Sequence, residues 1–90
     1  MLRRGDIVIG KLDDYYEAKI LLLVELDYED RWWVRNFGFA TSNYSGFNKY
    51  TLTKWKVKGE YYKVPIEALH KDRQNEIKTF IKEYMERDLV

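Results

Sequence analysis

The sequence predicts a mostly β fold in which five short strands are followed by a C-terminal helix. The central observation is that residues 15–26 (YYEAKILLLVEL) are apolar on both alternating faces, which is typical of a strand covered on both sides. The second is an apolar stripe at helical spacing near the end of the chain, formed by Ile77, Phe80, Ile81, Tyr84 and Met85. A curled sheet would cover one face of the strand, and this helix would cover the other.

Length and composition indicate the size of the core and the compartment. A chain of 90 residues forms one domain and buries about 60 to 65% of its unfolded surface, so its core needs large side chains. Four Phe, three Trp and eight Tyr supply them. The absence of cysteine excludes disulfides, and the longest apolar run, residues 20–24, is far short of the roughly 20 residues that span a bilayer. We therefore expect a cytoplasmic protein without a membrane segment.

Alternation and turn residues place the first two strands. Residues 7–9 form a short strand, and Gly10 after them marks a bulge or a close backbone approach. The central strand divides its apolar side chains between two faces. One face holds Ala18, Ile20, Leu22, Val24 and Leu26, and the other holds Leu21 and Leu23. Asp27, Glu29 and Asp30 then form an acidic hairpin tip.

Three further strands and the helix follow. Residues 31–37 direct Trp32 and Val34 to the core, and Arg31, Trp33, Arg35 and Phe37 the other way. Residues 38–49 form a long loop, residues 50–58 the next strand, and Tyr61, Tyr62 and Val64 the last one before Pro65. Asp72 caps a helix that reaches about Arg87 and packs on Leu21 and Leu23. We expect the five strands to form a barrel over residues 1–65 of a single domain, and the helical segment to occupy residues 66–90.

This plan matches a small SH3-like barrel better than a helical or βαβ fold. Several segments resemble the opening strands of Tudor and chromo-barrel domains: Gly5-Asp6-Ile7-Val8, Tyr16-Glu17-Ala18-Lys19-Ile20, and Trp33-Val34 leading to Phe37-Gly38. Residues 64–69 (VPIEAL) are similar to the Pro-containing turn that closes such barrels. The resemblance implies the barrel fold, whereas the caging aromatics of that family have no position-by-position counterpart here.

Residues 1–8 (MLRRGDIV) also resemble the start of PemK-type endoribonuclease toxins, which use an SH3-like barrel as well. That family continues into a Gly-rich loop and an Arg-Pro pair that carries its catalytic arginine. Here Asp13-Asp14-Tyr15-Tyr16-Glu17 stands instead. The resemblance therefore implies the barrel and not the catalysis.

The sequence contains no recognisable set of catalytic residues. His70 is the single histidine, which excludes sites that need two, and the five glycines stand singly rather than in a phosphate-binding loop. The adjacent acids at positions 13–14 and 29–30 fall in turns, where turn formation explains them. We expect a protein that is not an enzyme and uses no cofactor or metal.

Charge is segregated along the chain although the net charge is only +1. Residues 12–30 sum to −6 and residues 31–63 to +6. If the strands over 31–37 and 50–58 are neighbours, their outward side chains form one basic face with an indole at its centre. This face would consist of Arg31, Trp33, Arg35, Lys54, Lys56 and Lys58.

A basic face around an indole favours nucleic acid, with cations on phosphates and Trp33 stacked on an exposed base of a single strand. Phe39, Tyr44 and Phe47 of the long loop would add contacts. The plainer interpretation is that these lysines only keep a sheet soluble, and that the loop aromatics plug one end of the barrel.

A protein partner is the alternative. The loop aromatics could hold a peptide or a modified side chain through cation–π contacts. The acidic tip at residues 27–30 could instead complement the charge of a larger enzyme that the chain inhibits.

Overall fold

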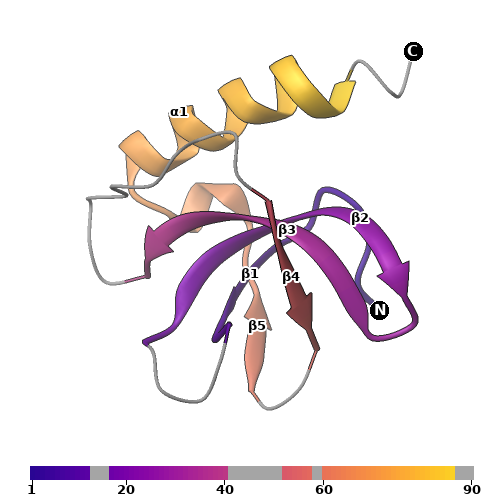
Figure 1. The fold of residues 1–90 in the computed structure, drawn as a ribbon. Helices are drawn as coiled ribbons and strands as arrows, with labels where there is room; N and C mark the ends of the chain where they lie inside the picture. The colour runs from indigo at the N-terminus through magenta and orange to yellow at the C-terminus, as the bar shows by residue number, and fades with distance from the viewer. Residues whose placement is uncertain (13–16, 41–51, 58–59, 87–90) are drawn as a thin grey trace.

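The molecule is a strongly curved antiparallel sheet with a helical segment lying across one face (Figure 1). The computed structural model describes residues 1–12, 17–40, 52–57 and 60–86. The strands are β1 (Ile7–Gly10), β2 (Lys19–Tyr28), β3 (Arg31–Phe39), β4 (Leu52–Lys56) and β5 (Tyr61–Lys63). They lie in the order β4-β3-β2-β1-β5. The predicted mostly β fold of five strands with a C-terminal helix is confirmed.

The helical segment starts directly after Pro65. It consists of the 3-10 turn η1 (Ile66–Ala68), the helix α1 (Lys71–Phe80) and the π-helical turn η2 (Ile81–Met85), which continues α1. His70 is the N-cap in place of the predicted Asp72, because its Nδ1 accepts a hydrogen bond from the backbone N–H of Asp72 at 3.2 Å. Asp72 lies inside the first turn, where a negative charge favours the helix dipole.

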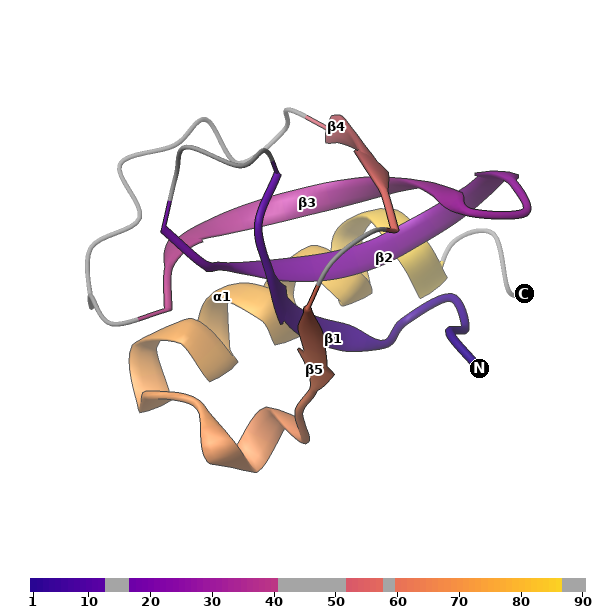
Figure 2. The same cartoon turned by 90° about the horizontal axis from the view of Figure 1, so that it is seen from below.

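The two edge strands are consecutive in the chain, so the sheet curls until β4 approaches the β1–β5 edge. Figure 2 shows the two edge strands, β4 and β5, on opposite sides of the central strand β2, as the strand order requires. Trp55 of β4 bridges them: its ring stands edge-on to Tyr61 with centroids 5.7 Å apart. A Cβ on Gly10 would lie 3.3 Å from Cζ2 of Trp55, so glycine permits the predicted close approach. Among the described residues β4 and β5 share no ladder, so hydrogen bonds do not close the sheet, and the SH3-like barrel stays a prediction.

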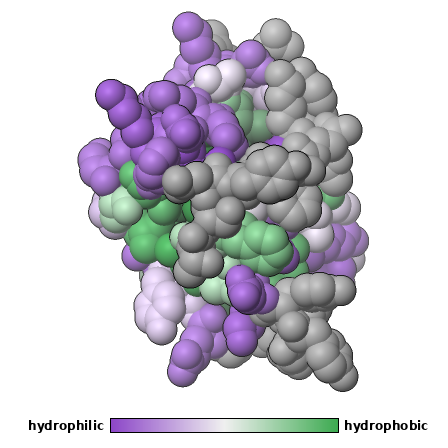
Figure 3. Space-filling view, turned by 90° about the vertical axis from the view of Figure 1, so that its left-hand side faces the viewer, coloured by the Kyte–Doolittle hydropathy of each residue, from purple (hydrophilic) through white to green (hydrophobic). Residues whose placement is uncertain are grey.

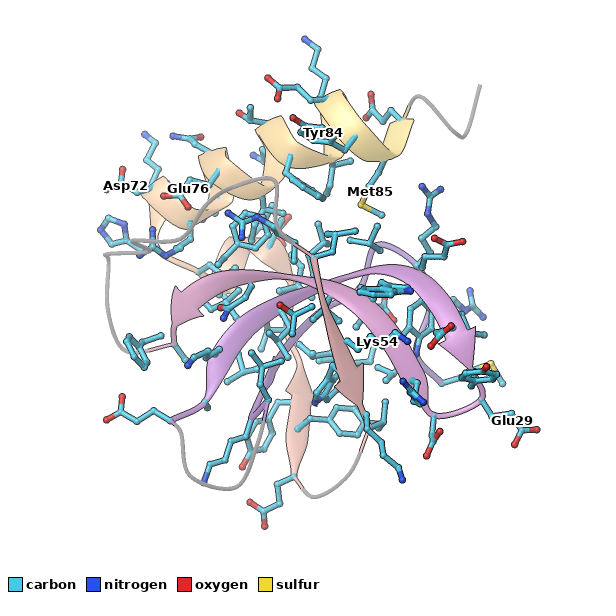
Figure 4. All side chains as sticks on the ribbon, in the orientation of Figure 1. Glu29, Lys54, Asp72, Glu76, Tyr84 and Met85 are labelled. Carbon is cyan, nitrogen blue, oxygen red and sulfur yellow. The ribbon has the colours of Figure 1, made fainter. Side chains whose placement is uncertain are left out.

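Two apolar clusters cover the two faces of the sheet. The outer cluster, beneath the helical segment, contains Ile7, Ile20, Leu22, Phe37, Ile77, Phe80 and Met85. The inner cluster, inside the curl, contains Val8, Leu21, Leu23, Trp32, Val34 and Trp55. Figure 4 shows Met85 pointing from the helical segment toward the sheet. The inward placement of Trp32 and Val34 is confirmed.

The prediction that the helix packs on Leu21 and Leu23 is wrong. Ile77 and Phe80 pack with Ile20 and Leu22, which point to the other face of β2. The curl of the sheet encloses Leu21 and Leu23 with Trp55, so the helix covers the face that remains.

A β-bulge in β2 changes the face on which Leu26 lies. Leu23 pairs with Val34 and Glu25 pairs with Trp33, so Val24 is an extra residue in β2. Cross-strand partners share a face, so Leu26, opposite Trp32, lies on the inner side. The prediction that Leu26 shares a face with Ile20 and Leu22 is therefore wrong, because one inserted residue inverts the alternation beyond it.

The third strand extends beyond its predicted end at Phe37. Gly38 and Phe39 belong to β3, and the register shifts between the pairs Lys19–Phe39 and Leu21–Asn36. Gly38 has a φ of 100° in this irregularity, and its N–H donates to Oδ1 of Asn36 at 2.8 Å. Of the rest of the predicted loop, Ala40 is described, and residues 41–49 lie outside the described residues.

The surface shown in Figure 3 carries hydrophilic side chains over its upper part, at the height of the helical segment. Hydrophobic side chains reach the surface below them.

No helix in the described ranges is long and apolar enough to cross a membrane.

Candidate functional site

The register of β3 and β4 brings together the cations that the sequence predicted around Trp33. Arg31 lies opposite Lys56, and Trp33 lies opposite Lys54. Cross-strand partners project from the same face of a sheet, so these four side chains form one patch. We call Arg31, Trp33, Lys54 and Lys56 the β3–β4 face. The prediction of one basic face requires that the two strands are neighbours, and they are.

Lys54 and Trp33 make direct contact in this patch. The Nζ atom of Lys54 lies 5.0 Å from the centroid of the Trp33 ring, within the range of a cation–π interaction. Trp33 is half-buried, and 44% of the Lys54 side chain remains exposed. An exposed contact of this kind contributes about 0.5–1 kcal/mol, so a ligand can displace the ammonium from the indole at small cost.

Asp27 of β2 is an acidic component that the sequence did not place here. Its Oδ2 lies 3.5 Å from Nζ of Lys54 and 3.8 Å from a guanidinium nitrogen of Arg31. Both cations are partly exposed, so each ion pair is worth about 0–1 kcal/mol. Asp27 therefore holds two cations of the β3–β4 face and also neutralises part of their charge.

Arg35 does not belong to the exposed face, so its predicted placement there is wrong. Arg35 is 3% exposed, and its Nη1 donates a hydrogen bond to the carbonyl of Asn36 at 2.8 Å. The guanidinium lies 5.1 Å from the Phe37 ring centroid. Burial lowers the pKa of Arg35, and the charge of Glu76 on α1 acts in the opposite direction. The cause is the helical segment, which covers the part of β3 that carries Arg35 and Phe37.

Phe39, the one predicted loop contact that the structure describes, does not lie on this face. Phe39 ends β3 at the opposite end from Arg31, and Nζ of Lys19 lies 4.6 Å from its ring centroid. Lys58, Tyr44 and Phe47 lie outside the described residues. Of the predicted residues that the structure describes, the four of the β3–β4 face are brought together, and Lys58, Tyr44 and Phe47 stay predictions.

Sequence reasoning missed Asp27 because it assigned that residue to a hairpin tip. The strand β2 continues to Tyr28, and a register shift between Leu26 and Tyr28 places Asp27 between two paired positions. The available signal was the alternation of Glu25, Asp27 and Glu29, which is typical of a strand with one solvated face.

Within the described residues no three His, Cys, Asp or Glu side chains gather as metal ligands. The imidazole of His70 caps α1, a structural task that the sequence analysis did not assign to it.

Comparison with known proteins gives no match: no family model matches the chain, and no curated protein or solved structure does so either. The resemblances to Tudor, chromo-barrel and PemK-type proteins therefore stay predictions.

Proposed function

We propose that the protein is a non-catalytic module that binds single-stranded nucleic acid weakly, with little sequence preference, on the β3–β4 face. The observation that carries the proposal is the register that sets Arg31, Lys54 and Lys56 around Trp33 on a face that solvent reaches. Cations at this spacing neutralise phosphates, and an indole offers a stacking surface to any base. A single strand is favoured because its bases are free to stack.

The charge balance makes weak binding the expectation. Asp27 neutralises part of the patch, and the chain as a whole carries a net charge of +1.

A chain without cysteine suits the reducing cytoplasm, where RNA is abundant. We also propose that the protein is an SH3-like barrel of the Tudor type.

A salt titration with fluorescein-labelled oligo(dT) tests the proposal. Three neutralised phosphates give a slope of log affinity against log salt of about −2, at roughly −0.7 per phosphate on a single strand. Lys54→Gln with Lys56→Gln should flatten the slope by about 1.4. Trp33→Ala should cost about 1–3 kcal/mol in binding and leave the slope unchanged.

The matched control is Lys78→Gln with Lys82→Gln, which removes two exposed lysines from the helical segment and changes the net charge equally. Its slope should equal that of the wild type. Absence of binding at low ionic strength, or equal flattening by both double variants, would show that the β3–β4 face is a solvated sheet surface and nothing more.

A further inference from the structure

A groove of about 450 Å³ lies away from the β3–β4 face, at the end of the sheet where the β2–β3 hairpin turns. Its walls come from the N-terminal segment, the hairpin, the residue after β4 and the first residue of β5. The apolar lining consists of Met1, Leu2, Leu26, Trp32, Val57 and Tyr61. This volume falls within the range of sites that enclose small ligands or side chains.

The walls of the groove are held by hydrogen bonds. The N–H of Val57 donates to the carbonyl of Asp30 at 2.7 Å, which fixes the end of β4 to the hairpin turn. On the opposite wall, Nζ of Lys63 donates to the carbonyl of Met1 at 3.3 Å and lies 3.2 Å from a carboxylate oxygen of Asp6. A groove held on both sides loses little conformational entropy when it binds a ligand.

Apolar side chains at this groove are exposed to solvent, whereas the side chains of the two core clusters are buried. Leu26 is 53% exposed because the bulge at Val24 directs it to the inner side of the sheet, where the curl no longer encloses it. Tyr61 is 36% exposed, although Trp32 beside them is buried. An open apolar groove is typical of a surface that another molecule covers.

The rim of the groove is acidic. Glu29 and Asp30 of the hairpin turn line it, and Figure 4 shows Glu29 projecting outward at the tip. In the part of the chain that the structure describes, neither carboxylate forms an ion pair, whereas Asp27 nearby pairs with Arg31 and Lys54. The two carboxylates disfavour a phosphate and favour a cation next to the apolar floor.

We infer that this groove is a docking site for a short segment of another protein in which an aliphatic side chain is flanked by Lys or Arg. The aliphatic side chain would pack on Leu26, Trp32 and Tyr61, and the flanking cations would pair with Glu29 and Asp30. The site is separate from the β3–β4 face, so it gives the molecule a protein contact in addition to the proposed nucleic-acid contact.

Three acetylated and amidated pentapeptides test the inference by titration of the ¹⁵N-labelled full chain, followed by NMR. Their sequences are Gly-Lys-Leu-Lys-Gly, Gly-Gln-Leu-Gln-Gly and Gly-Lys-Ser-Lys-Gly. The first should shift the amides of Leu26, Trp32 and Val57 in a saturable way. The second should bind about two- to tenfold more weakly, the range for one or two exposed ion pairs, and the third should not saturate.

Two variants separate the apolar and the charged contributions. Leu26→Ser, at an exposed position, should abolish saturation by the lysine–leucine peptide. Glu29→Gln with Asp30→Asn should bring the lysine and glutamine peptides to equal affinity, whereas Glu83→Gln with Glu86→Gln, an equal change in charge on the helical segment, should preserve their difference.

Three results would overturn the inference. One is the absence of saturable shifts at the groove with the lysine–leucine peptide. Another is equal loss of discrimination in both acidic double variants. The third is a concentration dependence of the groove amides without peptide, which would identify a second copy of the chain as the occupant.

Discussion

Arg31 and Arg35 stand four residues apart on the same side of β3, yet they have different roles. Alternation predicts correctly that both point away from Trp32 and Val34. It does not predict which part of that face another element covers. The helical segment covers Arg35 and leaves Arg31 beside the half-buried Trp33, so only one of the two is available to a ligand.

Asp27→Asn is the residue-scale test of the charge balance on the β3–β4 face. The substitution removes the acid that pairs with Arg31 and Lys54, so affinity for oligo(dT) should rise and the salt slope should steepen. The free energy of unfolding should change by less than about 2 kcal/mol, because each of the two partly exposed ion pairs is worth about 0–1 kcal/mol. Glu67→Gln, an equal charge change at another exposed site, is the control. An equal gain in affinity from both variants would refute a local role for Asp27.

At the scale of elements, the types were predictable and the details of β2 were not. Apolar alternation and turn residues predicted all five strands, and helical spacing predicted α1. The bulge at Val24 left no trace in the sequence, since Val24 continues the apolar pattern of Ile20 and Leu22. That one residue decides that Leu26 reaches the groove and that Glu25 lies beside Trp33.

Phe80→Ala tests the packing of the helical segment on the outer face of the sheet. Phe80 is 6% exposed, and its ring stands edge-on to Phe37 with centroids 6.0 Å apart. The substitution should lower the free energy of unfolding by about 3–5 kcal/mol, measured by urea denaturation. Thr79→Ala, at the exposed neighbouring position, should change it by less than about 0.5 kcal/mol. A loss below about 1 kcal/mol in Phe80→Ala would mean that the helix is not part of the core.

At the scale of the whole molecule, the closing of the sheet depends on side chains. The hydrogen-bonded order runs from β4 to β5 without joining them among the described residues, and Trp55 fills the space between the two edges. A sequence shows which strands are apolar, but the strand order and the side of the sheet that the helix covers depend on contacts between distant residues. The same physical limit explains why the sequence predicts a helix packed on Leu21 and Leu23 and does not predict the groove beside the β2–β3 hairpin.

Trp55→Ala therefore tests how the sheet is held closed. Trp55 is 1% exposed, and its Nε1 donates to the carbonyl of Lys11 at 3.0 Å, so the indole fastens the edge strand β4 to the chain after β1. Its removal should cost about 3–5 kcal/mol of stability, the usual range for a buried aromatic. Amides of β4 should exchange with solvent faster relative to those of β2, because β4 pairs only with β3 in the described structure and loses its contact across the curl. Lys56→Ala, one residue along the same strand but exposed, should leave both stability and exchange close to wild type. If Trp55→Ala instead accelerates exchange equally in β2 and β4, the indole supports the core as a whole and does not specifically join the edges.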